Sequence, residues 1–555
     1  MLSHLKVQLQ ALLEESLKEA FPQQQDFPSI ELERPSEKIH GDMACNVALK
    51  SAKILRKSPL QIANEILLVL NKNLNTLNGQ VLKVEVKNPG FINFYLSPEA
   101  FYSVLTEIFK QDEKFGRSDI GQKAKVQIEF VSANPTGPLS VAHARQAAVG
   151  DALGNILEAV GFKVTKEYYV NDEGNQINIL GNSIRLRAKE ILGERIEFPE
   201  DGYQGEYIKD MAREYLKKSK IDTLEKLAKH SLEKFRQFGV DYLMDVIKKD
   251  LEDFRARFDV WSHQSKIATP KSIAAVLELL KKKGFVYEKE GALWFRSTDF
   301  GDDKDRVVKK SDGSYTYLTP DIVYHKHKYE RGFQKVFNIW GPDHHGYIPR
   351  VKAAVQALGY DPNSLNVLIV QLATIYRDGK PLSMSTRRGQ FISLREVIDE
   401  VGVDAARYFF LMRHISGHLE FDLELAKKQT AENPVYYIQY AHARVHSINK
   451  KVKELKLKSK QKDFSLLKEE TELDLIKKLA AFGEILMVCQ QESDPYALAG
   501  YLQELAIVFH KFYESNRIVD VDPELGSERL GLANATRIVL ANGLKLLGMA
   551  TPETM

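Results

Sequence analysis

The chain has 555 residues and a formal net charge of +3; 44% of its residues are hydrophobic and 28% are charged. This length predicts three or four domains, each large enough to bury a core of its own. The near-balanced charge excludes a chain that is basic throughout, although it permits local basic faces.

No stretch approaches the roughly 18 consecutive apolar residues of a membrane span, and the N-terminus lacks the basic start and cleavage site of a secretory signal. We therefore expect a cytoplasmic protein with no membrane partner. Cys45 and Cys489 lie far apart and fit no Cys/His metal-ligand spacing. We expect two buried thiols and no structural metal.

The first 110 residues mix helix and strand. Residues 1–21 have the pattern of an amphipathic helix, and Ser58 is well placed to cap a second helix that begins at Pro59. Residues 81–86 alternate as a half-buried strand does, and a turn leads into a second strand over 91–95. This pattern predicts a small α+β domain.

A different pattern begins at Val126. Residues 126–131 are rich in β-branched and aromatic side chains, a Gly/Pro loop follows, and apolar residues at helical spacing predict a helix over about 141–160. Strand, loop and helix form the first unit of a doubly wound sheet. Residues 336–340 and 366–371 are further strand candidates, with a helix near 349–358 between them.

Two other stretches complete the predicted architecture. Residues from about 172 to 290 are mostly helical and highly charged, which indicates an insertion, and no convincing strand follows Pro434. We predict an α/β fold: a small N-terminal α+β domain (1–110), a catalytic Rossmann-type domain with a doubly wound parallel sheet and a helical insertion (111–425), and a C-terminal all-α bundle (426–555).

The segment Asn134-Pro-Thr-Gly-Pro-Leu-Ser-Val-Ala-His143 leads into the first helix of that sheet. Free N–H groups and the helix dipole make such a helix N-terminus suitable for phosphate, and a histidine one turn in can donate to phosphate oxygens. By itself this segment is more often an ordinary strand-to-helix turn with a satisfied histidine.

Two further segments carry polar residues after strands of the same sheet. Ser383-Met-Ser-Thr-Arg-Arg-Gly389 has the hydroxyls and arginines of a mobile anion-binding loop, although a solvated basic turn is the more common origin of such a stretch. Trp340-Gly-Pro-Asp-His-His-Gly-Tyr347 fits a nucleotide-contacting turn better than a metal site, because adjacent histidines point apart.

A fourth group combines acids with a phenol. Tyr317 and Asp321 lie four residues apart, and Glu129 ends the first predicted strand of the sheet. Carboxylates pair bidentately with a guanidinium group, so this set suits a guanidinium substrate. Each acid taken singly is as well explained by an ordinary surface or salt-bridged carboxylate.

In this order along the chain, the segments resemble the arginyl-tRNA synthetases of class I in their bacterial form. Residues 134–143 are similar to that family's His-Ile-Gly-His signature and 383–389 to its Lys-Met-Ser-Lys-Ser signature. The resemblance covers nearly the whole chain. It also includes His40-Gly-Asp42, Asn88-Pro-Gly-Phe-Ile92, Tyr169-Val-Asn-Asp-Glu-Gly-Asn-Gln176, Asp404-Ala-Ala-Arg407 and the terminal Pro-Glu-Thr-Met.

The resemblance implies ATP-dependent ligation of L-arginine to its tRNA for protein synthesis, through an arginyl-adenylate, by a monomer with Mg²⁺ carried on the ATP phosphates. The residues implied to bind arginine are Glu129, Asn134, Tyr317, Asp321 and Gln371. The residues implied to bind ATP are Pro135, Gly137, Ser140, Ala142, His143, Gly341, Asp343, His344 and Ser385. The residues implied to act in catalysis are Asn134, Ser140, His143, Ser383, Met384, Ser385, Thr386 and Arg387.

The resemblance also assigns the tRNA to the outer domains. The N-terminal domain would touch the tRNA elbow, and the C-terminal helices would read the anticodon. Tyr436, Tyr437 and Tyr440 would stack on anticodon bases, although packing inside the bundle explains these tyrosines equally well.

Both catalytic signatures lack groups that the family's pattern contains. Ser140 and Ala142 replace a histidine and a glycine, while Ser383 and Thr386 replace two lysines. A charge-assisted hydrogen bond contributes about 1.5–3 kcal/mol, so each lost cation costs about 10- to 100-fold in rate unless another replaces it. The replacements nearest in sequence are Lys125, Lys380, Arg387 and Arg388.

Two alternative functions remain at this point. One is a catalytically inactive tRNA-binding paralogue that kept the scaffold and lost the cations. The other is a class I ligase for another amino acid; the absence of zinc-type cysteines disfavours the cysteine enzyme, and the paired carboxylates disfavour apolar substrates.

Overall fold

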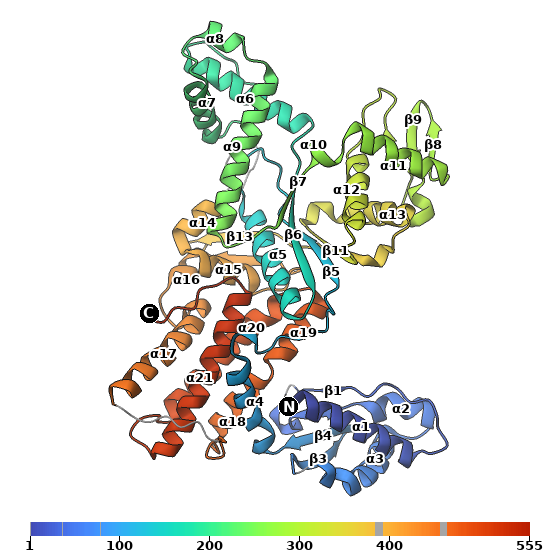
Figure 1. Ribbon diagram of the computed structural model, residues 1–555, viewed down its shortest axis with the longest axis vertical. Helices are drawn as coiled ribbons and strands as arrows, with labels where there is room; N and C mark the ends of the chain where they lie inside the picture. The colour runs from blue at the N-terminus through green and yellow to red at the C-terminus, as the bar shows by residue number, and fades with distance from the viewer. Residues whose placement is uncertain (1, 36, 78, 383–391, 456–462) are drawn as a thin grey trace.

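A computed structural model describes residues 2–35, 37–77, 79–382, 392–455 and 463–555. Its centre is a five-stranded sheet of order β12-β11-β5-β6-β7 in which every neighbouring pair is parallel (Figure 1). The strands are β5 (Lys125–Glu129), β6 (Lys163–Val170), β7 (Val260–His263), β11 (Lys335–Trp340) and β12 (Leu365–Ile369). The predicted doubly wound sheet is confirmed, and the order reverses between β5 and β11, where such folds bind ligands.

The first strand and its helix follow the prediction closely. Helix α5 (Val141–Ala159) begins where the periodicity predicts, but β5 ends at Glu129, two residues earlier than expected. Val131 and Ser132 instead adopt positive φ values of 68° and 40°. A β-branched residue rarely adopts this conformation, and such backbone strain clusters at functional loops.

The helical insertion forms an arm above the sheet with its own apolar core (Figure 1). It comprises α6 (Asn175–Ile191), α7 (Glu206–Ser219), α8 (Leu224–Ala228) and α9 (Leu232–Asp253). The range expected for the insertion, about 172–290, also contains β7, which is an edge strand of the central sheet. That four-residue strand has too few residues to show a pattern in the sequence.

A second subdomain lies between β7 and β12 and has a separate core. Its antiparallel sheet has the order β10-β9-β8. The elements are α10 (Gln264–Ile267), α11 (Pro270–Lys282), β8 (Val286–Lys289), β9 (Ala292–Phe295), β10 (Arg306–Lys309), α12 (Leu318–Glu330), the 3-10 helix η5 (Pro342–Tyr347) and α13 (Ile348–Leu358).

The N-terminal domain packs four strands in the order β1-β2-β4-β3 against helices. The Ser58 hydroxyl accepts a hydrogen bond from the Gln61 backbone N–H at 3.3 Å, which confirms the predicted cap. The elements are α1 (Leu2–Ala20), β1 (Leu32–Glu33), β2 (Met43–Cys45), α2 (Val47–Leu55), α3 (Pro59–Asn73), β3 (Val81–Lys87), β4 (Phe91–Leu96) and α4 (Pro98–Gln111).

The C-terminal part joins a small mixed sheet to a helical bundle. The connecting elements are β13 (Ala373–Arg377), β14 (Lys380–Pro381), α14 (Leu394–Val401), α15 (Val403–Leu411), β15 (Leu419–Asp422) and α16 (Leu423–Lys427). The bundle contains α17 (Pro434–Glu454), α18 (Glu470–Ala480), α19 (Phe482–Glu492), α20 (Tyr496–Ser515) and α21 (Pro523–Leu546). None of the helices in the described ranges is long and apolar enough to cross a membrane.

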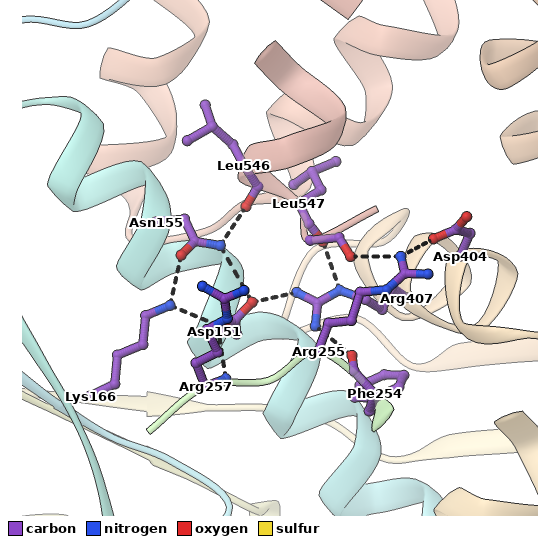
Figure 2. Close-up of polar contacts among 11 residues, drawn as sticks. Asp151, Asn155, Lys166, Phe254, Arg255, Arg257, Asp404, Arg407, Leu546 and Leu547 are labelled. Atoms are coloured by element: carbon purple, nitrogen blue, oxygen red, sulfur yellow. Dashed lines mark hydrogen bonds and ion pairs between the residues drawn. The ribbon is translucent and has the colours of Figure 1, made fainter. Parts of the chain in front are cut away.

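A buried ionic cluster joins the bundle to the central sheet (Figure 2). We call Asp151, Asn155, Lys166 and Arg407 the interdomain cluster. Arg407 on α15 donates to Asp151 on α5 at 2.7 Å and to the carbonyl oxygens of Phe254 and Leu547 at 3.0 and 2.8 Å. Lys166 donates to Asp151 and Asn155, both at 2.7 Å. The cluster thereby ties α5 to the ends of α9 and α21.

Candidate active site

The loop after β5 is held from two sides. The Tyr168 hydroxyl donates to the Ala133 carbonyl oxygen at 2.8 Å, and the Tyr207 hydroxyl of α7 donates to that of Thr136 at 2.8 Å. The Asn134 amide donates to Gln176 on α6 at 2.6 Å. A Cβ on Gly137 would lie 3.2 Å from the Tyr207 hydroxyl. The insertion therefore covers the loop that precedes α5.

His143 and Ser140 form one hydrogen-bonded unit at the N-terminus of α5. The backbone N–H of Ser140 donates to His143 Nδ1 at 3.2 Å, and the Ser140 hydroxyl lies 3.1 Å from the same atom. Burial lowers the pKa of His143 to about 4, so the ring is neutral at pH 7. Because Nδ1 accepts, the proton resides on Nε2, which is the atom able to donate to a ligand.

The N-terminus of α5 is also paired with the chain that follows residue 391. The backbone N–H of Leu394 donates to the Leu139 carbonyl at 2.7 Å, and that of Val141 donates to the Ile392 carbonyl at 3.2 Å. On the other side of the loop, Leu382 bonds to Ile375 of β13 at 2.9 Å. Ser383, Met384, Ser385, Thr386 and Arg387, together with Arg388, lie outside the described residues.

The turn after β11 lies beside α5 at the same edge of the sheet. A Cβ on Gly341 would lie 2.7 Å from Asp343 Oδ1 and 3.6 Å from the side-chain amide of Gln146 on α5. Asp343 and His344 are exposed, with Oδ1 and Nδ1 3.2 Å apart. A glycine at 341 thus keeps the backbone open where a nucleotide would approach, and two polar groups stand next to it.

One face of α12 points toward the ends of β5 and β11. Asp321, Tyr324, His325 and Lys328 occupy positions i, i+3, i+4 and i+7, which lie on one side of a helix. Lys328 Nζ donates to Glu129 Oε2 at 2.5 Å and to Asn338 Oδ1 at 2.7 Å. The other oxygen of Glu129 accepts from the Ser132 hydroxyl at 2.9 Å.

Asp321 faces a phenol from a different element. The Tyr347 hydroxyl at the end of η5 donates to Asp321 Oδ2 at 2.6 Å. Burial raises the pKa of Asp321 to about 6; the bond from Tyr347 opposes this rise, while the Glu129 charge adds to it. The site therefore has a carboxylate that gains by receiving a cation.

A second buried carboxylate, Glu167 on β6, lies next to this face. It accepts hydrogen bonds from the Ser262 and Tyr324 hydroxyls at 2.6 and 2.8 Å and from Arg331 at 2.5 Å. These bonds join β6, β7 and α12 behind the site. The ring of Tyr324 also stacks on Tyr169 at 4.3 Å.

Three models of known protein families match separate ranges of this chain. Residues 104–414 match the catalytic domain described as tRNA synthetases class I (R), 438–555 match the DALR anticodon binding domain, and 7–96 match the arginyl tRNA synthetase N terminal domain. The chain belongs to the class I arginyl-tRNA synthetase family. The resemblance inferred from the motifs is confirmed.

Relatives are similar over almost the whole chain. The arginine--tRNA ligase of Syntrophotalea carbinolica is 45% identical over 99% of this chain and 100% of its own length, and that of Bacillus subtilis is 44% identical over 97% of each. The arginyl-tRNA synthetase of Thermus thermophilus, at 22% identity, superposes with a TM-score of 0.75 over 99% of this chain and 100% of its own, which shows the shared fold.

The site residues that the family resemblance implied differ in how far they are buried. Tyr317 is 71% exposed at the start of α12, about one helical turn before Asp321 on the same side of the helix. The Gln371 backbone is fixed by Arg145 of α5, which donates to its carbonyl at 2.7 Å. Asn134, Ser140, His143, Gly341 and Asp343 all lie at the carboxyl-terminal edge of the sheet, where doubly wound folds bind ligands.

Of the four candidate replacements for the missing signature cations, Lys125 is excluded by its position. Lys125 begins β5 and lies at the amino-terminal edge, with Nζ 3.8 Å from where a Cβ on Gly332 would be, in the turn that leads into β11. Four residues of strand, about 13 Å at 3.3 Å per residue, separate it from the carboxyl-terminal edge. Lys380 is exposed in the β13–β14 hairpin, three residues before the loop.

Four residues of the site were not predicted: Tyr324, His325, Lys328 and Tyr347. The helical spacing from Asp321 is a signal for the first three, since positions i+3, i+4 and i+7 share its face. Nothing in the sequence pairs Tyr347 with Asp321. Within the part of the chain that the structure describes, no group of three or more His, Cys, Asp or Glu side chains is placed to hold a metal ion.

Proposed function

We propose that this chain joins L-arginine to the 3′ end of its tRNA in two steps. The arginine carboxylate attacks the ATP α-phosphate, forming arginyl-adenylate and releasing pyrophosphate. A hydroxyl of the terminal tRNA ribose then attacks the acyl carbon, and AMP leaves. The observation that carries this proposal is that the carboxylates of Asp321 and Glu129 stand at the same sheet edge as the His143 helix N-terminus.

For arginine, we propose that Asp321 receives the guanidinium group while Tyr347 holds its second oxygen. A carboxylate and a guanidinium form a planar, charge-assisted pair. Asn134 would bind the amino-acid end, and Glu129 and Gln371 would line the pocket. Tyr317, exposed at the start of α12 one turn before Asp321, would border the open side of the pocket.

For ATP, we propose that the N-terminus of α5 holds the phosphates. The positive end of the helix dipole at the first turn favours anions, and His143 Nε2–H is oriented to donate because Ser140 occupies Nδ1. Pro135, Gly137 and Ala142 would form the surface under the nucleotide, and Gly341, Asp343 and His344 would contact its sugar. Mg²⁺ would arrive on the phosphates with few direct protein ligands, and residues 383–387 would complete the site.

For tRNA, we propose that the N-terminal domain contacts the elbow and that the C-terminal bundle reads the anticodon, in a monomeric cytoplasmic enzyme. The rings of Tyr436 and Tyr440 stack with their centres 6.1 Å apart, and the ring centres of Tyr437 and His510 are 4.4 Å apart. All three tyrosines are half-buried, so each keeps an exposed part that a base could contact.

The test is ATP–pyrophosphate exchange with each amino acid, with and without tRNA. We expect exchange with arginine, and only when tRNA is present. Exchange with another amino acid would overturn the assignment of substrate. The absence of exchange with every amino acid, together with retained tRNA binding, would instead support an inactive tRNA-binding paralogue, which no observation favours at present.

A further inference from the structure

A fully buried ammonium lies directly behind the proposed arginine pocket. The Lys328 side chain is 0% exposed, and that of its partner Glu129 is 8% exposed. Lys328 Nζ lies 2.5 Å from Glu129 Oε2, 2.7 Å from Asn338 Oδ1 and 4.4 Å from the centre of the Tyr324 ring. We call Glu129, His325, Lys328 and Asn338 the pocket cluster.

The hydrogen bonds of the pocket cluster fix the protonation of His325. Since Asn338 Oδ1 accepts from Lys328, its Nδ2 is the donor to His325 Nε2 at 2.9 Å. His325 Nδ1 must then carry the proton, which it donates to the Asp321 backbone carbonyl at 2.8 Å. Burial, aided by Lys328, lowers the pKa of His325 to about 3. His325 therefore adds no charge.

The carboxylates around the pocket differ in their partners. Glu129 and Glu167 bind the cations Lys328 and Arg331, while Asp321 binds the Tyr347 hydroxyl. Lys328 neutralises Glu129, and Arg331 neutralises Glu167. Among the described residues Asp321 has a phenol as its hydrogen-bond partner and no ion pair. Asp321 is therefore the carboxylate at which the cationic end of a substrate would find no competing ion pair among the described residues.

We infer that Lys328 is a positioning residue for arginine recognition: it holds the Glu129 carboxylate in place near Asp321, so that both carboxylates keep the arrangement that fits a guanidinium group. This inference rests on the proposed function and extends it to a residue that does not touch the substrate.

The experiment replaces Lys328 by methionine, which has nearly the same shape and no charge. We expect the KM for arginine in tRNA-dependent pyrophosphate exchange to rise about 10- to 100-fold, because Glu129 loses the donor that holds it in position beside the pocket. The KM of Lys328→Met for ATP in the same assay should stay within about twofold of that of the unmodified protein. Lys328→Arg keeps the charge and should recover part of the loss.

The matched control is Lys166→Met in the interdomain cluster. Lys166 is equally buried and is paired with Asp151 at 2.7 Å, but it faces no substrate. This variant should lose thermal stability and keep the KM for arginine. If Lys166→Met raises that KM as much as Lys328→Met does, the effect of Lys328 is merely structural and the inference is overturned.

A second readout is the pH profile of the KM for arginine. The groups facing Asp321 are Glu129 from β5, Lys328 from its own helix, and Tyr347 and His344 from η5. Removing the Lys328 charge should raise the pKa of Asp321, so the loss of arginine binding at low pH should begin at a higher pH. An unchanged profile in a folded Lys328→Met protein would contradict the inference.

The double variant Glu129→Gln/Lys328→Met covers the case in which the single variant does not fold. It removes both charges together and should be more stable than Lys328→Met, because no buried charge is left unpaired. Its KM for arginine should still exceed that of the unmodified protein; an unchanged KM overturns the inference. Absence of exchange in the unmodified protein would overturn the proposed function itself, which is a different outcome.

Discussion

The pocket cluster and the interdomain cluster use the same residue types for different purposes. Each contains a fully buried cation paired with a carboxylate, Lys328 with Glu129 and Arg407 with Asp151. Around the pocket, Lys328 pairs with Glu129 and Arg331 pairs with Glu167, whereas Asp321 has no ion pair among the described residues. In the interdomain cluster one carboxylate meets two cations, whose remaining hydrogen bonds go to main-chain and amide oxygens (Figure 2).

Whether a buried carboxylate has a cationic partner helps to distinguish a binding residue from a structural one. A buried ion pair by itself is weak evidence for either role, because desolvation offsets most of the attraction. The charge that remains unmatched is more informative. In the interdomain cluster the cations donate to protein oxygens, and the cluster holds the domains together. Beside the pocket cluster, Asp321 has no ion pair among the described residues, which favours the binding of a cationic ligand.

The largest effect is expected from Arg407→Met. Removing one partner of a buried ionic network costs about 3–5 kcal/mol, because Asp151 and two carbonyl groups lose their donor. Thermal unfolding should show the loss. The KM for arginine in the folded protein should be unchanged; a large rise would show that the interdomain cluster also shapes the pocket.

Gly548→Ala tests the interdomain cluster through the glycine that packs against Arg407. A Cβ at this position would lie 2.4 Å from Arg407 Cζ, and the residue has a φ of +71°. Overpacking and the left-handed backbone together cost about 2–4 kcal/mol. Gly301→Ala is the control, since its φ is +90° and no described atom lies within 4 Å of its Cβ position. Equal melting temperatures for the two variants would contradict the close contact.

Asp321→Asn should lower activity with arginine and leave thermal stability unchanged, the reverse of Arg407→Met. It removes the unmatched carboxylate and keeps the shape of the side chain, so kcat/KM for arginine should fall by about 10- to 150-fold, the equivalent of a charge-assisted hydrogen bond. Thermal stability should not fall, because the buried charge that it removes has no ion pair. A stability loss comparable to that of Arg407→Met would erase the contrast between the clusters.

The smallest effect is a pH dependence of arginine binding. In the free protein the pKa of Asp321 is raised to about 6. A bound guanidinium favours the ionised form, so affinity is full above pH 6 and falls by up to about tenfold per pH unit below it. The effect on folding has the opposite sign, since a raised carboxyl pKa makes stability fall as pH rises toward 6. Isothermal titration at several pH values would check this, with Asp321→Asn as the control that lacks the dependence.

Local patterns in the sequence were sufficient for most of the architecture. The alternation in 81–86, the cap at Ser58 and the periodicity after Val141 each specify an element through neighbouring residues alone, and all three elements form as expected. The ordered motifs likewise specified the family. Placement of Asn134 and His143 at the sheet edge followed because strand, loop and helix are contiguous in the chain.

Contacts between distant segments were decided only by the tertiary structure. Strand β7 pairs with β6 across an insertion of four helices, and its four residues carry no pattern of their own. Lys125 is near the signature in sequence, yet strand direction places it at the opposite edge. Lys328 meets Glu129 across 199 positions, and Tyr347 meets Asp321 through the packing of η5 against α12. A side chain's neighbours along the chain predict its element, whereas its charge partner depends on how those elements pack.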